Sequence, residues 1–275
     1  MATVSANQTS PVGRQYDRFQ ASLETMGKER KFLNYGYSVE PTTYEECQER
    51  LCHEVFRAAD IRAGDRIVDV GFGSGEQDFV LARTHEFDRL DGFNISQRQV
   101  TFANERARRE KLHGKLAFHL GEAERLEGIE NGTVDKLFAI ECAFYFDRAR
   151  FYRRVAEVLK PGGIVVLADI SFAERLAFLT RQGEHYRRVG TQSGNRHEWE
   201  RHLRTKSVRS INKWTAPGAQ VSVWKILRVV PVSVLSLPEV REWVKMAFSS
   251  QLVALGLRTG LVCYDLIVLE RPLEL

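Results

Sequence analysis

The sequence predicts an α/β protein with a doubly wound, mostly parallel sheet, a final antiparallel strand, a helical N-terminal cap and a helical lid. Residues 67–70 form a short apolar, β-branched run, which is typical of a buried parallel strand. This run leads into a helical segment at 77–83 through three glycines at alternate positions, Gly71, Gly73 and Gly75. A strand, a glycine turn and a helix in this order begin a nucleotide-binding βαβ unit. Near the other end of the chain, residues 264–269 predict the final strand.

The spacing of the glycines indicates which nucleotide the turn would bind. A dinucleotide-binding turn has the pattern G-x-G-x-x-G, and its third glycine would stand at position 76, which is Glu76. The sequence instead has G-x-G-x-G, with Asp69 two residues before the first glycine. This segment resembles motif I of the class I S-adenosylmethionine methyltransferases. The resemblance implies that Asp69 and the three glycines hold the methionine and ribose parts of the cofactor; an ordinary strand-to-helix turn is the alternative.

The N-terminal residues predict a tail and a cap. Residues 1–13 are small and polar and indicate a disordered tail, and the pattern at 14–30 fits an amphipathic helix. The next segment contains Tyr35 in the string F-L-N-Y-G-Y, which resembles the N-terminal cap of small-molecule methyltransferases. Such aromatics close over the cofactor sulfonium and the substrate, or Tyr35 simply packs the helix on the core. Thr43 and Glu46 then predict a helix with a capping box.

The second strand, at 89–94, ends in an amide where a carboxylate is usual. An acid about 20 residues past the glycine turn commonly holds the ribose hydroxyls, but the residue here is Asn94. The string N-x-S-x-x-Q from Asn94 to Gln99 resembles a variant found in sugar and polyketide O-methyltransferases and in cyclopropane fatty acid synthases. An amide both donates to and accepts from a hydroxyl pair. We therefore assign Asn94 and Gln99 to the ribose, with Asp91 as the less favoured substitute.

The third strand, at 116–120, is followed by Gly121, Glu122 and Ala123. In the methyltransferases that this sequence resembles, a G-(D/E)-A turn places the acidic side chain beside the adenine amino group. The resemblance therefore implies that Gly121, Glu122 and Ala123 bind the adenine part of the cofactor.

The fourth and fifth strands predict the catalytic end of the sheet, because open α/β sheets bind ligands at the carboxyl ends of their strands. The fourth strand leads to Glu141, which we assign both to catalysis and to the cofactor. Related enzymes often have a histidine pair just after this glutamate, but the residues here are Phe144 and Tyr145. Either another residue is the base or the substrate needs none. The fifth strand follows a K-P-G-G turn and leads to Asp169, a second candidate base whose alternative role is to cap the next turn. The catalytic candidates are thus Glu141, Tyr145 and Asp169.

Four parts follow from these assignments. We expect an N-terminal tail and helical cap at 1–40 and a Rossmann-like cofactor-binding core at 41–172. A substrate lid is expected at 173–235, and a C-terminal helix and strand that complete the core at 236–275. The first part of the lid, to about residue 215, is polar, arginine-rich and predicted to be helical. Most of these arginines suit a solvated helical face, and one or two could grip an anionic group of the substrate.

Composition limits the classes of partner. The chain has 275 residues, 43% hydrophobic and 28% charged, with a net charge of +4, which permits anionic partners without demanding nucleic acid. No apolar run has the length that a membrane span needs, and the first residues have neither the basic start nor the apolar core of a secretory signal. The four cysteines show neither C-x-x-C pairing nor metal spacing. We expect a reduced, cytoplasmic protein with no metal, membrane or nucleic-acid partner, and leave a homo-oligomer open.

The resemblance to class I S-adenosylmethionine methyltransferases covers residues 32–172. It implies S-adenosylmethionine as the cofactor and an SN2 displacement that moves its methyl group to an O, N or alkene C atom of a small, secondary-metabolite-like acceptor. An RNA or protein methyltransferase and a non-catalytic protein that binds S-adenosylmethionine are the alternatives. A nicotinamide-dependent dehydrogenase is disfavoured by Glu76 and Asn94.

Overall fold

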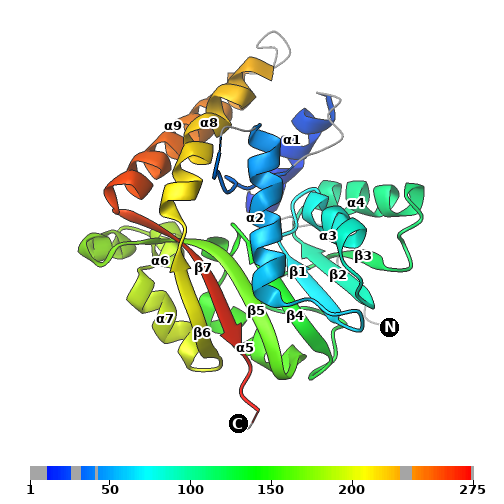
Figure 1. Cartoon of the computed structure of the whole chain (residues 1–275). Helices are drawn as coiled ribbons and strands as arrows, with labels where there is room; N and C mark the ends of the chain where they lie inside the picture. The colour runs from blue at the N-terminus through cyan, green and yellow to red at the C-terminus, as the bar shows by residue number, and fades with distance from the viewer. Residues whose placement is uncertain (1–10, 26–31, 41–42, 230–236, 274–275) are drawn as a thin grey trace.

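A seven-stranded sheet lies between two layers of helices in the computed structural model, which describes residues 11–25, 32–40, 43–229 and 237–273 (Figure 1). The strands are β1 (Arg66–Val70), β2 (Arg89–Asn94), β3 (Leu116–Leu120), β4 (Val134–Ile140), β5 (Leu159–Phe172), β6 (Arg204–Ser210) and β7 (Val262–Glu270). The α-helices are α1 (Pro11–Thr25), α2 (Tyr44–Ala59), α3 (Glu76–Thr84), α4 (Gln97–Arg109), α5 (Arg148–Val158), α6 (Glu184–Val189), α7 (Gln192–Glu200), α8 (Asn212–Val229) and α9 (Leu237–Thr259). Two 3-10 helices complete the set, η1 (Ala143–Tyr145) and η2 (Glu174–Arg181).

The strand order is β3-β2-β1-β4-β5-β7-β6, and β7 runs antiparallel to both of its neighbours. The pairs of β1 with β2 and β4, of β2 with β3, and of β4 with β5 are parallel. The order reverses between β1 and β4, which is where open α/β sheets form their ligand crevice. The predicted doubly wound, mostly parallel sheet with a final antiparallel strand is confirmed.

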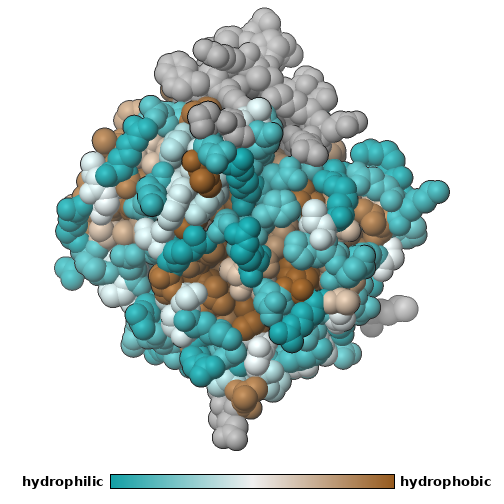
Figure 2. Space-filling view, in the orientation of Figure 1, coloured by the Kyte–Doolittle hydropathy of each residue, from teal (hydrophilic) through white to brown (hydrophobic). Residues whose placement is uncertain are grey.

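The two faces of the sheet carry separate hydrophobic cores because strand side chains alternate between faces. On one face, Val166 and Ala168 of β5 belong to the core that includes α2, α3 and α4. On the other, Val165 and Leu167 pack in the core that includes α5 and α7. Hydrophilic residues cover most of the surface in Figure 2, and hydrophobic ones show near the centre of the view. Because the two cores lie on opposite faces, the face that a strand residue occupies decides which site it can join.

Two expectations about elements need correction. The segment predicted as helical from residue 173 to about 215 contains β6, which pairs with β7 on one side only. Its sequence, R-T-K-S-V-R-S, is mostly exposed and basic, as suits an edge strand, so it lacks the apolar alternation that predicts a strand. Residues 11–13, predicted to be disordered, begin α1. The helix predicted at 14–30 is described as far as Thr25, and the rest of that prediction falls on residues 26–31, which lie outside the described part of the chain.

The predicted helix start at Thr43 is confirmed in detail. The Thr43 side chain accepts a hydrogen bond from the Glu46 amide, and the Glu46 carboxylate accepts one from the Thr43 amide at 2.9 Å. These bonds form the capping box and fix the direction in which α2 leaves the cap segment. The paired helices α8 and α9, and helix α1, lie above the sheet in the view of Figure 1.

Candidate active site

The turn after β1 requires glycine at three alternate positions. Its three glycines have φ values in the left-handed region: Gly71 (69°), Gly73 (59°) and Gly75 (76°). A Cβ atom at Gly71 would lie 2.6 Å from the Cβ of Cys142, and one at Gly73 would lie 2.9 Å from Leu33 Cδ1. Both the backbone conformation and the close contacts therefore require glycine here.

Asp69 lies fully buried at the end of β1, directly before this turn. Its Oδ2 accepts a hydrogen bond from Gln77 Nε2 at 3.0 Å, whereas its Oδ1 has no partner among the described residues. Burial raises the pKa of Asp69, and hydrogen bonds from Asp78 and Gln77 oppose that rise. Asp78 lies beside Asp69 and its Oδ2 also has no partner among the described residues, so the two acids form a buried pair at the glycine turn.

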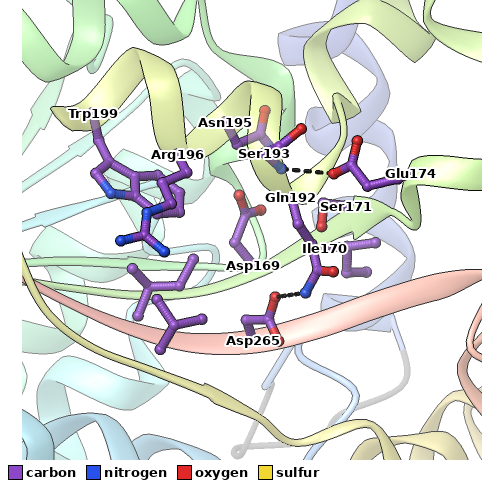
Figure 3. A pocket seen from close by; sticks show the side chains of 12 residues that line it. Asp169, Ile170, Ser171, Glu174, Gln192, Ser193, Asn195, Arg196, Trp199 and Asp265 are labelled. Carbon is purple, nitrogen blue, oxygen red and sulfur yellow. Dashed lines mark hydrogen bonds between the residues drawn. The ribbon is translucent and has the colours of Figure 1, made fainter. Parts of the chain in front are cut away.

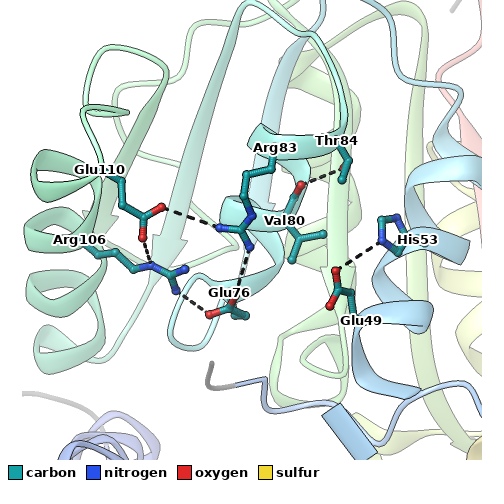
Figure 4. A network of polar contacts seen from close by, with 8 residues as sticks. All are labelled: Glu49, His53, Glu76, Val80, Arg83, Thr84, Arg106 and Glu110. Carbon is teal, nitrogen blue, oxygen red and sulfur yellow. Dashed lines mark hydrogen bonds and ion pairs between the residues drawn. The ribbon is translucent and has the colours of Figure 1, made fainter. Parts of the chain in front are cut away.

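Glu76 has a structural reason for standing where a dinucleotide site has glycine. It is the first residue of α3 and is fully buried, and its Oε2 lies 2.5 Å from Arg106 of α4. Arg83 approaches its other oxygen at 3.4 Å, and Arg106 also contacts Glu110 at 2.6 Å (Figure 4). This ionic network ties the start of α3 to α4 behind the glycine turn.

The predicted ribose pair is brought together beside the glycine turn. Asn94 donates a hydrogen bond from Nδ2 to Gln99 Oε1 at 2.8 Å, and the same nitrogen lies 3.4 Å from the Gly73 carbonyl oxygen. Ser96 caps α4 by accepting from the Gln99 amide at 3.2 Å, which sets Gln99 in the first helical turn. Gln99 is 1% exposed, and its Nε2 has no acceptor among the described residues. This nitrogen is a second buried polar atom that a ligand would satisfy.

The predicted adenine turn lies next to Asn94. The Gly121 amide donates to the Asn94 carbonyl oxygen at 3.0 Å, and Ala123 is buried. Glu122 is exposed and pairs with Arg125 at 2.9 Å. Its role toward adenine stays a prediction.

Glu141 joins three distant parts of the chain. Its Oε1 accepts a hydrogen bond from the Tyr35 amide and another from the Tyr264 hydroxyl, each at 2.7 Å. Burial raises the pKa of Glu141 to about 8, although these two hydrogen bonds act in the opposite direction. A carboxylate with this pKa can exchange a proton near neutral pH.

Tyr145 forms an aromatic wall with residues from two other elements. Its hydroxyl lies 3.2 Å from that of Tyr16 in α1, and the two rings meet edge to face at 6.0 Å. Phe144 is 4.6 Å away between ring centroids, and His185 of α6 is 6.4 Å away. Burial raises the pKa of both tyrosines, so both are neutral phenols at neutral pH.

Helix α1 lies across the glycine turn and the start of α4. Gln20 is fully buried and accepts a hydrogen bond from the Ser74 hydroxyl at 2.9 Å. Asp17 accepts from the Ser96 hydroxyl at 2.6 Å and from the Arg98 amide at 3.0 Å. The amphipathic pattern predicted this helix but not its place over the site.

Comparison with known proteins identifies the family. The methyltransferase domain family matches residues 68–167. The 27-O-demethylrifamycin SV methyltransferase of Amycolatopsis mediterranei is 30% identical over 217 residues, which cover 75% of this chain and 78% of that enzyme. The chain belongs to the S-adenosylmethionine-dependent methyltransferases.

A second curated relative and a solved structure are also similar to this chain. The erythromycin 3''-O-methyltransferase of Saccharopolyspora erythraea is 37% identical over 145 residues, which cover 52% of this chain and 47% of that protein. The crystal structure of the cyclase SpnF has a TM-score of 0.82 at 19% identity and covers 98% of this chain and 99% of that one. At that identity the likeness shows the fold alone. The class I methyltransferase resemblance and the S-adenosylmethionine cofactor are confirmed for this chain.

The residues present fit the cofactor of this methyltransferase family. Asp69 Oδ1 and Gln99 Nε2 are a buried acceptor and a buried donor without protein partners in the described residues, and they flank the glycine turn along the chain. Gly71 and Gly73 leave no room for side chains in that turn. A ligand with ammonium and ribose hydroxyl groups offers the donors and acceptors that these atoms lack.

Asp169 is not brought into the cluster around Glu141. Its Oδ2 lies 2.8 Å from Arg148 of α5, and both side chains are buried on the sheet face that packs against α5 and α7. Tyr264, which contacts Glu141, belongs to the core on the opposite face. Of the two candidate carboxylates, Glu141 is therefore the one held by Tyr35 and Tyr264, whereas Asp169 is held by Arg148.

The site contains residues that the sequence did not single out. Tyr264 opens the predicted final strand, and only the antiparallel pairing of β7 with β5 places it near Glu141. Tyr16 and Gln20 lie in a helix whose pattern indicated packing alone. Nothing local in the sequence distinguishes these residues from core residues.

The described ranges contain neither a cluster of metal ligands nor a membrane-spanning helix. In these ranges no three histidine, cysteine, aspartate or glutamate side chains gather as metal ligands. Within the same part of the chain, no helix combines the length and the apolar character that crossing a membrane requires.

Proposed function

We propose that this methyltransferase moves the methyl group of S-adenosylmethionine to a hydroxyl oxygen of a small, secondary-metabolite-like acceptor, with Glu141 as the general base. Two relatives support an oxygen acceptor: by name, they methylate the 3''-oxygen of erythromycin and 27-O-demethylrifamycin SV. The sequence resemblance alone also allows an amine nitrogen or an alkene carbon as the acceptor. The observation that carries the proposal is the pair of hydrogen bonds that hold the carboxyl of Glu141 and leave its pKa at about 8.

The chemistry assigns one task to each group. The bound cofactor supplies an electrophilic methyl group on a sulfonium ion. Both hydrogen bonds to Glu141 end on Oε1, so Oε2 is the oxygen that takes the proton of the acceptor hydroxyl. The Tyr35 amide and the Tyr264 hydroxyl orient the carboxylate, and the neutral Tyr145 and Tyr16 rings exclude water from one side.

The cofactor residues follow the sequence assignments. Asp69 and the glycine turn would hold the methionine part, and Asn94 with Gln99 would hold the ribose. Gly121, Glu122 and Ala123 would border the adenine, with Tyr35 and Glu141 near the sulfonium. We also propose that the enzyme is cytoplasmic, because its four cysteines are free, as in a reducing compartment.

The acceptor class is tested by transfer of labelled methyl from S-adenosylmethionine into a lysate of the source organism. Label in the organic extract, with a product whose added mass lies on oxygen by mass spectrometry, is the expected result. Label confined to RNA or protein would contradict the small-molecule proposal, and an N- or C-methylated product would contradict the oxygen acceptor.

The base is tested by Glu141→Gln, because glutamine keeps an oxygen that accepts from Tyr35 and Tyr264 but cannot take a proton. We expect turnover to fall by about 10²- to 10⁴-fold while calorimetric affinity for S-adenosylmethionine stays within about twofold. The matched control is Glu127→Gln, whose side chain is exposed. Wild-type turnover in Glu141→Gln would remove Glu141 from the mechanism.

A further inference from the structure

A cavity lies on the opposite face of the sheet from the Tyr264–Glu141 contact. It measures about 340 Å³ and lies between β5, β7, β6 and α7 (Figure 3). Trp199 of α7, Val208 of β6 and Ile267 of β7 form an apolar wall, and carboxylates of β5 and β7 form a polar one. This cavity includes none of the residues assigned to the cofactor.

Two carboxylates in this cavity each keep one oxygen without a partner. Asp169 and Asp265 are both 4% exposed, and both line the cavity. Asp169 Oδ2 contacts Arg148 at 2.8 Å, and Asp265 Oδ2 accepts from Gln192 Nε2 at 2.8 Å. The Oδ1 atom of each has no hydrogen-bond partner among the described residues. Two such buried acceptors in one cavity indicate a donor that the protein does not supply.

The register of the sheet places the two acids directly opposite each other. Asp169 of β5 pairs with Asp265 of β7 in the antiparallel ladder, and like charges at such positions destabilise a sheet. Arg148 balances one of the two charges. Burial and the nearby Asp169 raise the pKa of Asp265, whereas the hydrogen bond from Gln192 opposes that rise. A cation between the two Oδ1 atoms would relieve this repulsion.

The other charged residues that line the cavity do not bond to the two free Oδ1 atoms. Glu174 lines the cavity and accepts from the Ser193 amide at 2.8 Å. Arg196 also lines it, but its Nε donates to Glu200 at 2.7 Å. No group of three ligands suited to a metal ion occurs in the described ranges. Hydrogen-bond donors on a small organic cation fit two separated carboxylate oxygens better than a bare metal ion, which needs more ligands.

We propose that this cavity binds a small organic molecule with a primary ammonium group and an apolar body. The ammonium donates to Oδ1 of Asp169 and of Asp265, and the apolar body packs against Trp199, Val208 and Ile267. The site is separate from the cofactor site, and it does not depend on which acceptor the enzyme methylates.

The test uses cyclohexylammonium chloride as the probe on the full-length protein. Its six-carbon ring suits the apolar wall, and its ammonium has three donors. Cyclohexanol serves as the neutral control of the same shape, and sodium chloride at equal ionic strength controls for screening. We expect saturable binding by calorimetry and a rise in unfolding temperature with the ammonium alone. An equal effect of cyclohexanol or of sodium chloride, or no saturation, would overturn the proposal.

Variants locate the binding. Asp265→Asn removes one charge at constant shape, and Val208→Trp fills the cavity from the exposed edge strand, where a larger side chain is tolerated. We expect each to weaken the probe at least tenfold. The control Asp65→Asn alters a buried acid just before β1, which contacts Lys136 and the Arg62 amide instead, and should keep wild-type affinity. If Asp265→Asn does not fold, Val208→Trp decides: unchanged affinity there would exclude this cavity.

Discussion

Hydrogen bonds fix the side chain of Glu141, and its backbone adopts an uncommon conformation. Its φ is 53°, in the left-handed region that residues other than glycine rarely adopt. Its amide donates to the Ala168 carbonyl oxygen at 2.8 Å, and its carboxyl is fixed by Tyr35 and Tyr264. Strained residues that the surrounding structure holds in place cluster at functional sites. At the scale of the residue, geometry and strain therefore both point to Glu141.

The raised pKa of Glu141 sets a direction for the pH dependence. A general base works only when it is deprotonated, and with a pKa of about 8 the carboxyl is mostly protonated at lower pH. We expect kcat/KM to rise about tenfold per pH unit below this value and to level off above it. The measurement is a pH–rate profile of methyl transfer. A flat profile between pH 6 and about 9 would argue against Glu141 as the base.

Tyr264→Phe tests whether Tyr264 positions the base. The Tyr264 hydrogen bond lowers the pKa of Glu141, so its removal should raise that pKa and move the pH–rate profile to higher pH. Tyr152→Phe is the matched control, because Tyr152 is equally buried but belongs to the core on the other face. A loss of rate without any shift in the profile would indicate a purely structural role for Tyr264.

At the scale of the element, Arg148 anchors the short helix α6 to the sheet. Its guanidinium contacts Asp169 and donates to the Arg188 carbonyl oxygen at 2.8 Å and the Val189 carbonyl oxygen at 3.3 Å. Arg188 in turn donates to the Tyr145 carbonyl oxygen at 2.5 Å. The aromatic wall at Tyr145 is thus connected, through Arg188, to the Arg148–Asp169 ion pair on the opposite face of the sheet.

Replacement of Arg148 should lower the stability of the protein. Arg148→Leu leaves the buried Asp169 charge unpaired, which typically lowers the free energy of unfolding by about 3–5 kcal/mol. Denaturant unfolding monitored by circular dichroism measures the change. Arg150→Leu, in the same helix but 72% exposed, should change it by less than about 1 kcal/mol. Equal stability of the two variants would show that the Arg148–Asp169 pair adds nothing.

At the scale of the whole molecule, α1 closes the cofactor site from a part of the chain distant in sequence. Gln20 and Asp17 bind Ser74 at the glycine turn and Ser96 at the start of α4. A bound cofactor would lie between these two elements and leave only when α1 moves. We therefore expect α1 to act on cofactor exchange as well as on packing.

Gln20→Ala tests this closure. It removes the hydrogen bond to Ser74 across the closure, of about 1 kcal/mol, together with a bond to Glu24 inside α1, so we expect dissociation of S-adenosylmethionine to speed up about fivefold in stopped-flow fluorescence. Asp17→Ala should act in the same direction, and the exposed Gln15→Ala should leave the rate unchanged. Unchanged dissociation in both test variants would mean that α1 does not control release.

The cofactor half of the protein is readable from sequence because its signals are local. The three glycines, the segment from Asn94 to Gln99 and the turn at Gly121 each lie within a few consecutive residues, and strand order then collects them at one edge of the sheet. By contrast, β6 has no apolar pattern because it is a basic edge strand, so its position was missed. The division into cap, core, lid and C-terminal part stays a prediction.

The sequence by itself determined the α/β class, the glycine turn, the cofactor and the methyltransferase family. Those features depend on short-range backbone chemistry, which consecutive residues specify. Only the tertiary structure decided that Glu141 meets Tyr35 and Tyr264, and that Asp169 faces Arg148 and Asp265 instead. The physical reason is the alternation of side chains along a strand: a shift of one position moves a carboxylate from one face of the sheet to the other, and only pairing between strands distant in sequence fixes which face that is.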